Sequence, residues 1–119
     1  MKVIYIAGPF RDQTPWRVEL NVRRAEVCAL KIVELGFAPL IPHTMYRYYT
    51  GAAPDQYWLD ATRELLTRCD AVWFLDNWAN SQGSVGEYQT ATRLGIPTFT
   101  GEDALLKIKE FFNAQTKKE

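Results

Sequence analysis

Short apolar runs alternate with segments of helical periodicity along the chain, and this alternation limits the fold more than any other feature. The runs are residues 2–7, 37–41, 71–75 and 96–100. Their nearly continuous apolar character is typical of strands that are buried on both faces, as in parallel sheets. Because helical segments separate most of these runs, we expect an α/β protein whose parallel sheet is covered by helices on both faces.

The helical segments have recognisable ends. Thr14-Pro15 predicts an N-cap followed by a first-turn proline, and Gly36 ends the helix that begins there. Further helices are predicted over residues 55–69, 87–94 and from residue 104 onward. Residues 43–54 follow neither period and contain several tyrosines, so we expect a loop there that forms a lid.

Size and composition limit the possible functions. At 119 residues, 47% of them hydrophobic, the chain fits one domain, 1–119, with a substantial core. Lys and Arg balance Asp and Glu at 14 each, which argues against nucleic acid or a membrane surface as partner. The N-terminus lacks the long apolar segment of a signal peptide, so we expect a cytoplasmic protein.

The cysteines do not predict a metal site. Cys28 and Cys69 lie far apart in helical patterns, and His43 is the single histidine of the sequence. A structural zinc site needs about four ligands, so we expect free, buried thiols and no metal. The glycines of residues 83–86 match neither the phosphate-binding nor the dinucleotide fingerprint, and we expect no cofactor.

Two loops are the places to search for a binding site. In parallel α/β sheets, ligands bind at the carboxyl ends of the strands, where the winding direction reverses. These loops are Gly8–Gln13, after the first strand, and Asp76–Gly86, after the third. The second loop contains Ser81, Gly83 and Ser84 and opens onto a helix, whose N-terminal N–H groups suit an anion or sugar hydroxyls.

Two residues near these loops have structural explanations as well as functional ones. Spacing alone favours a capping box in which Ser84 and Glu87 satisfy each other's backbone donors. Tyr5, on the first strand, would by itself be read as a core aromatic residue. Trp78 either stacks on a ligand or covers the sheet edge.

Two longer motifs resemble a known family. Residues 5–11 (YIAGPFR), together with Ser81, Glu87 and the helix ending in residues 94–97 (LGIP), are similar to the nucleoside 2-deoxyribosyltransferase superfamily. The similarity is strongest to the 2'-deoxynucleoside 5'-phosphate N-hydrolases and CMP N-glycosidases. It is closer still to a deoxyribosyltransferase-like family of small proteins, whose strand entry matches residues 69–71.

This resemblance implies a three-layer flavodoxin/Rossmann-like fold with four to five parallel strands, and cleavage of an N-glycosidic bond. The family's glutamate nucleophile corresponds to Glu87 and its orienting tyrosine to Tyr5. Phosphate-binding positions correspond to Arg11 and Ser81. We therefore expect the substrate-binding residues to be Gly8, Pro9, Phe10, Arg11, Trp78, Ser81, Gly83 and Ser84. The resemblance also implies a homodimer or higher homo-oligomer in which a neighbour completes the pocket.

The proton donor to the leaving base is left open. The family's acidic residue corresponds to Thr62, which cannot supply a proton as a carboxylic acid does. Asp60 and Glu64 lie two residues away along a helix and so point in other directions. Asp76, at the end of the third strand, is the better-placed catalytic candidate. Asp55 and His43 are further candidates, although a lone loop histidine is more often exposed.

These observations lead to one principal hypothesis and two alternatives. The principal one is hydrolysis or transfer at the N-glycosidic bond of a nucleoside 5'-monophosphate or (deoxy)nucleoside, with Glu87 as nucleophile. The first alternative is a binding module that senses a nucleotide without cleaving it. The second is a structural partner protein with a vestigial pocket.

Overall fold

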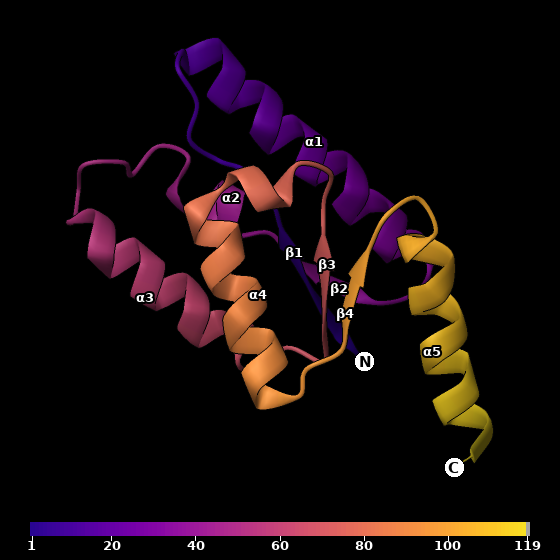
Figure 1. Cartoon of the computed structure of the whole chain (residues 1–119). Helices are drawn as coiled ribbons and strands as arrows, with labels where there is room; N and C mark the ends of the chain where they lie inside the picture. Colours follow the sequence, from indigo (N-terminus) through magenta and orange to yellow (C-terminus); the bar gives the residue numbers. More distant parts are fainter. Residues whose placement is uncertain (119) are drawn as a thin grey trace.

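A four-stranded parallel sheet forms the centre of the computed structural model, which describes residues 1–118 (Figure 1). The strands are β1 (Val3–Ala7), β2 (Ala38–Leu40), β3 (Ala71–Phe74) and β4 (Thr98–Thr100), in the order β2-β1-β3-β4. All three pairings are parallel, and Tyr5 of β1 lies opposite Leu40 on one side and Val72 on the other. The α/β fold class predicted from the apolar runs is confirmed.

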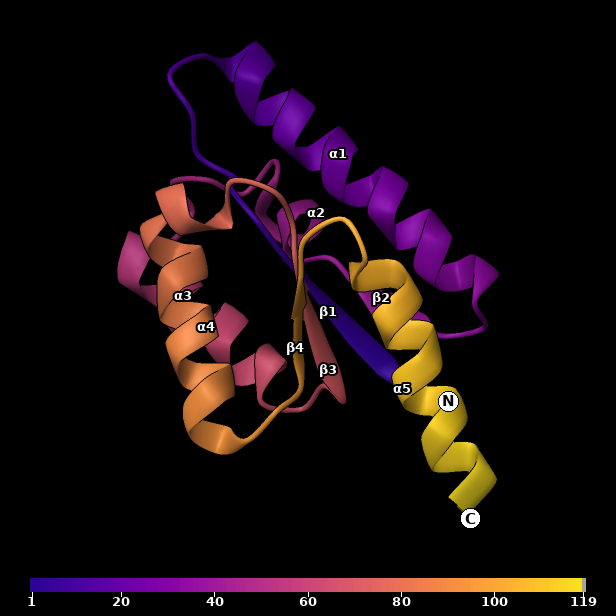
Figure 2. The ribbon, with the colours of Figure 1, turned by 45° about the vertical axis from the view of Figure 1, so that its right-hand side comes forward.

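Helices cover both faces of this sheet. They are α1 (Pro15–Glu34), α2 (Pro42–Tyr46), α3 (Asp55–Leu66), the 3-10 turn η1 (Trp78–Asn80), α4 (Gln82–Leu94) and α5 (Ala104–Lys118). The helices α1 and α5 lie on one face of the sheet, and α3 and α4 lie on the other (Figure 2). No helix in the described part of the chain is both long enough and apolar enough to cross a membrane.

The two faces form separate cores because successive strand residues point to opposite sides. Ile4 and Ile6 of β1 pack with residues of α1 and α5, whereas Tyr5 and Ala7 pack with Leu66 of α3 and with residues of α4. All four strand residues are fully buried. The face that carries Tyr5 is therefore the face on which α3 and α4 lie.

The strand order places the winding reversal between β1 and β3. The chain crosses from β1 to β2 on one side and later places β3 and β4 on the other. The loops after β1 and β3 are therefore neighbours at the carboxyl edge of the sheet. Gly8 touches the second of them closely: a Cβ at this position would lie 3.2 Å from Cβ of Leu75.

Two predicted boundaries differ most from the structure. The helix expected from residue 87 begins at Gln82, because Ser81 and not Ser84 is its N-cap. The segment 43–54, expected to be a loop, includes residues of the short helix α2, whose first residue is Pro42. In contrast, the predicted cap of α1 is confirmed, since Thr14 Oγ1 accepts the N–H of Arg17 at 3.2 Å.

Candidate active site

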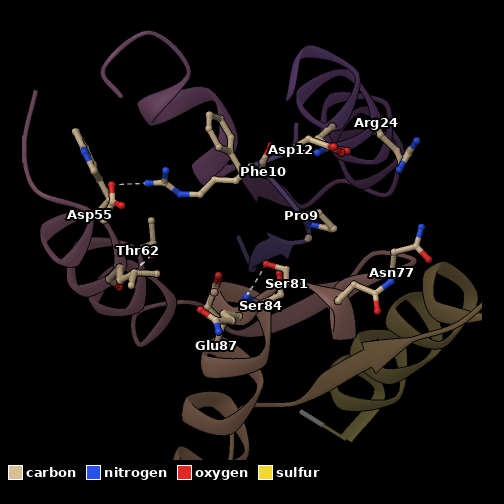
Figure 3. Close-up of a pocket in the computed structure, with 18 of the residues that line it drawn as sticks. Pro9, Phe10, Asp12, Arg24, Asp55, Thr62, Asn77, Ser81, Ser84 and Glu87 are labelled. Atoms are coloured by element: carbon tan, nitrogen blue, oxygen red, sulfur yellow. Dashed lines mark hydrogen bonds and ion pairs between the residues drawn. The ribbon is translucent and has the colours of Figure 1, made fainter. Parts of the chain in front are cut away.

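A cavity of about 1050 Å³ lies at the carboxyl ends of β1 and β3. Its walls come from the loop after β1, the first half of α1, the segment 50–63 and the start of α4. Figure 3 shows Pro9 and Phe10 on one side of this space and Ser81, Ser84 and Glu87 on another. The two loops predicted from the sequence as the place of a binding site thus share one cavity.

Glu87 is a buried carboxyl group on the wall of this cavity. Its side chain projects from the second turn of α4, and the residue is only 9% exposed. Burial raises the pKa of Glu87 from 4.5 to about 7, while a hydrogen bond from Tyr5 and the positive charge of Arg63 act in the opposite direction. Its Oε2 atom is buried and makes no hydrogen bond within the described residues.

Tyr5 lies behind Glu87 and does not line the cavity. It is fully buried in the middle of β1, between β2 and β3. Its side-chain hydrogen bond to Glu87 lowers the pKa of that carboxyl group, so the phenol donates to the carboxylate form. The two residues that the resemblance pairs are therefore adjacent, with Glu87 facing the cavity and Tyr5 supporting it.

The capping-box interpretation of Glu87 is wrong. Ser81 Oγ accepts the N–H of Ser84 at 3.2 Å, so the helix start lies before both Ser84 and Glu87. Glu87 is too far along α4 to reach the N-cap backbone as a capping box requires. Ser84, 1% exposed, has an Oγ without a hydrogen-bond partner among the described residues, and it lines the cavity.

The start of α4 is suited to an anion. The first N–H groups of a helix have no partner inside it, and here Ser81 satisfies that of Ser84. Those of Gln82 and Gly83 are left for other acceptors, at the positive end of the helix dipole. Ser81, Gln82 and Gly83 all line the cavity, as the sequence predicts for Ser81 and Gly83.

Arginines and aspartates face each other at the cavity mouth. Arg11, from the loop after β1, donates through Nη2 to Asp55 Oδ1 at 2.6 Å, and a dashed line ends at Asp55 in Figure 3. Both side chains are more than half exposed, so this ion pair is weak and can exchange partners. Arg17 lies 3.9 Å from Asp12 at the same rim.

Arg63 is a site residue that the sequence reading missed. It lines the cavity from α3, and its positive charge lowers the pKa of Glu87. Its guanidinium group crosses α4 at Gly86, where an added Cβ would lie 3.1 Å from Arg63 Cζ and closer to Nη2. Its Nε atom is buried without a hydrogen-bond partner in residues 1–118. Glycine before the glutamate was the signal that could have predicted this close approach.

Thr62 lies on the cavity wall, where the resemblance places an acid. It is 4% exposed, and its hydroxyl donates to the carbonyl of Leu59 in its own helix at 3.2 Å (Figure 3). Asp60 and Glu64 contact Gln56 and Arg68 along the outside of α3 and are not cavity residues. The carboxyl groups on the cavity wall are those of Asp12, Asp55 and Glu87.

His43 is buried, and the expectation of an exposed loop histidine is wrong. Its Nε2 lies 3.1 Å from the carbonyl oxygens of both Gly8 and Pro9. Because a carbonyl oxygen only accepts, the neutral ring carries its hydrogen on Nε2 and holds the loop after β1 in place. Burial lowers the pKa of His43, against the effect of these two hydrogen bonds.

Asp76 and Trp78 lie away from the cavity. Asp76 lines a smaller cavity of about 200 Å³ together with Cys28 and Trp73. Trp78 stacks on Tyr88 with ring centroids 4.7 Å apart and packs against Phe74, so it covers the sheet rather than lining the site. The structure therefore separates both residues from Glu87. No group of three or more metal-ligating side chains forms within the described chain.

A family model described as a domain of unknown function, DUF7768, matches residues 2–100. The chain belongs to the DUF7768 family. No curated protein sequence matches this DUF7768 chain significantly. Among solved structures, the 2-deoxyribosyltransferase from the psychrotolerant bacterium Bacillus psychrosaccharolyticus has a TM-score of 0.60 and 19% identity, covering 82% of the DUF7768 chain and 70% of its own. That enzyme is described as a biocatalyst for the synthesis of antiviral and antitumoral nucleosides. At this identity the likeness shows the fold, which is deoxyribosyltransferase-like.

Proposed function

We propose that this protein cleaves the N-glycosidic bond of a nucleoside 5'-monophosphate or (deoxy)nucleoside, with Glu87 as the nucleophile. The sugar is passed either to water, in hydrolysis, or to another base, in transfer. The observation that carries the proposal is the buried carboxyl group of Glu87 on the wall of the main cavity, with Oε2 lacking a partner among the described residues and Tyr5 behind it. Its deoxyribosyltransferase-like fold supports the same reading.

The reaction would proceed in two steps. The Glu87 carboxylate attacks the anomeric carbon, and the bond between that carbon and the base breaks with its electron pair going to the base nitrogen. Water, or a second base, then attacks the glycosyl ester and returns Glu87 as a carboxylate. Tyr5 would act as a positioning residue that orients the carboxylate, as its hydrogen bond suggests.

The leaving base needs its developing negative charge stabilised. Thr62 supplies no carboxylic acid, and its hydroxyl donates to its own helix. Arg63 lies in the cavity beside Glu87 with an unpaired Nε–H within the described chain, and its positive charge can stabilise a base that leaves as an anion. We therefore assign Arg63 a role on the leaving group.

The 5'-phosphate would bind at the start of α4. Ser81, Ser84 and the N–H groups of Gln82 and Gly83 offer donors there, at the positive end of the helix. Arg11 would add charge: it contacts Asp55 through one nitrogen, and its remaining N–H groups are available for an oxyanion. Gly8, Pro9 and Phe10, in the same loop, would contact the sugar.

Release of free base is the decisive measurement. We expect the wild-type protein, in large excess over substrate, to release base from one or more of a panel of nucleosides, nucleoside monophosphates and NAD, as detected by chromatography. Glu87→Gln should lower this rate by about a thousandfold or more, because an amide is not a nucleophilic carboxylate. Glu110→Gln, an exposed site on α5, is the matched control. No release by the wild type from any member of the panel would contradict the proposal.

A second candidate function is a sensor that binds a nucleotide without cleaving it. The occupied hydroxyl of Thr62, in the place of an acid, is the observation that favours it. Calorimetry with a nucleoside monophosphate separates the two functions, since a sensor binds saturably and returns its ligand intact. We also propose that the protein is a homodimer or higher homo-oligomer, as the resemblance implies.

A further inference from the structure

The long helix α1 has apolar side chains on two opposite faces. Its inner face packs on the sheet through residues such as Val22, Ala25 and Ala29. Its outer face carries four large apolar residues, which are exposed to the extents given: Trp16 57%, Leu20 38%, Val27 57% and Leu30 60%. In both views the outer side of α1 faces away from the rest of the molecule (Figures 1 and 2). A surface helix normally has a polar outer face, so this stripe is unusual.

The outer residues follow the spacing of a helix that pairs with another helix. Positions 16, 20, 23, 27, 30 and 34 alternate in steps of four and three, which is the heptad seam of a coiled coil. Arg23 and Glu34 are the polar members of the seam. Arg23 lies over the ring of Trp16, 5.3 Å from the centroid, and its charge is partly offset by Glu19 at 3.6 Å.

The charges that flank this seam define an orientation. One flank is basic, with Arg17, Arg24 and Lys31 at steps of seven, and the other is acidic, with Glu19 and Glu26. In a parallel helix pair, each acidic flank position faces the basic position five residues later on the other helix. Glu26 then faces Lys31 of a second copy, and Glu19 faces Arg24. An antiparallel pair would place each flank opposite the flank of the same charge.

Most of these flanking charged residues form no ion pair within the described part of one copy. Within the described residues, Arg24, Glu26 and Lys31 form no ion pair, whereas Glu19 contacts Arg47 and Arg23. We propose that the outer face of α1, centred on Leu20, Val27 and Leu30, pairs in parallel with α1 of a second copy of this chain. Apolar contact supplies affinity, and the Glu26–Lys31 pairs set the orientation.

This pairing would place the second copy beside the candidate active site. Arg17, Leu20 and Arg24, which belong to the seam or its basic flank, also line the main cavity. A second α1 on this face would therefore border the cavity mouth. The pairing stands on the sequence and exposure of α1 and does not depend on the glycosidase proposal.

Sedimentation velocity of the full chain tests the pairing. We expect a dimer at micromolar concentration, and Leu30→Glu should weaken association roughly a hundredfold, because it would bury a charge in the seam twice. The control is Leu106→Glu on α5, where the replaced leucine is 57% exposed and lies outside the seam. A monomeric wild type, or a Leu30→Glu protein that stays dimeric, overturns the proposal.

Charge reversal tests the orientation and does not depend on the Leu30 variant being folded. Glu26→Lys places two repulsive pairs in a parallel dimer and should weaken association roughly tenfold. The double variant Glu26→Lys with Lys31→Glu recreates opposite charges across the pair and should recover wild-type association to within about threefold. Recovery supports parallel pairing, and a double variant as weak as the single one contradicts it. Far-ultraviolet circular dichroism confirms that each variant is folded.

Discussion

A glutamate whose pKa is about 7 is divided almost equally between acid and carboxylate at neutral pH, and burial puts Glu87 in this position. Tyr5 and Arg63 both favour the carboxylate, yet burial has the larger effect. Near neutral pH, Glu87 is therefore a poorly solvated carboxylate in only part of the molecules. Such a shift in a cavity is characteristic of functional carboxyl groups.

The pH dependence of turnover follows from this pKa. A nucleophile must be ionised, so kcat/KM for base release should rise as pH increases through about 7 and level off above it. Measuring kcat/KM for base release at a series of pH values from 5 to 9 tests this expectation. If kcat/KM instead fell through the same range, Glu87 would be acting as an acid.

At the residue scale, sequence reasoning predicted the pair but not its surroundings. Tyr5 and Glu87 were predicted because short motifs around both are similar to a known family. Arg63 was not, because its role depends on the packing of α3 against α4. Gly86 indicates a close approach to α4 but does not identify which residue of α3 makes it. His43 was expected to be exposed because it is a lone histidine in a predicted loop. In the structure it contacts two carbonyl groups that lie more than thirty positions earlier in the chain, and local patterns do not indicate such a contact.

At the scale of elements, the position of one glycine connects α3 to α4. Gly86 leaves room for the guanidinium of Arg63, which runs over the helix beside Glu87. An alanine there meets the flexible end of that arginine, so the side chain would be displaced while the backbone stays in place. The position of the Arg63 charge can thus be altered from α4 without replacing a charged residue.

Gly86→Ala is the corresponding test. Moving the Arg63 charge away should raise the pKa of Glu87 further, and alanine in place of glycine inside a helix should keep or slightly raise stability, by up to about 1 kcal/mol. Carbon-detected nuclear magnetic resonance titration of the Glu87 carboxyl group measures the pKa. Gly83→Ala is the control, because a Cβ there makes only ordinary contacts, the nearest at 3.6 Å to Leu59. An unchanged pKa in Gly86→Ala would show that Arg63 does not act on Glu87.

Helix and strand types were predictable, whereas the start of α4 was not. The pattern of residues 84–87 fits a capping box, but Ser81 is an equally good cap and gains an extra turn of helix. Local capping rules cannot choose between two serines three residues apart. In the structure Ser81 is the N-cap, so Ser84 and Glu87 both lie in the helix body rather than at its end.

At the scale of the whole molecule, the location of the site was predictable because topology determines it. Nearly all-apolar strands imply a parallel sheet, and a parallel sheet implies a winding reversal at which strand ends meet. The cavity lies there. What the topology leaves undetermined is which side of the sheet each loop residue faces, and so Asp76 and Trp78 could not be placed in advance.

Burial of the Glu87 carboxyl group should make the stability of the whole protein depend on pH. Well below pH 4.5 Glu87 is protonated in both the folded and the unfolded state. As pH rises toward 7 the unfolded state ionises first, so the free energy of unfolding falls, by on the order of 3 kcal/mol in total. Glu87→Gln should remove this loss and be more stable than wild type at pH 8, but not at pH 4.5. Urea denaturation at both pH values measures the difference, and an equal destabilisation at both would contradict it.

The contact between Gly8 and Leu75 has a consequence for how such a site can diversify. The two loops that line the cavity begin at the ends of β1 and β3. Because Gly8 has no side chain, these two strand ends lie close together, and a methyl group at position 8 would push Leu75 away. The distance between the two loops therefore depends on Gly8 and not on the residues that line the cavity farther along each loop. Residues farther along each loop can change to suit a different ligand while the contact between Gly8 and Leu75 keeps the two loops at the same separation.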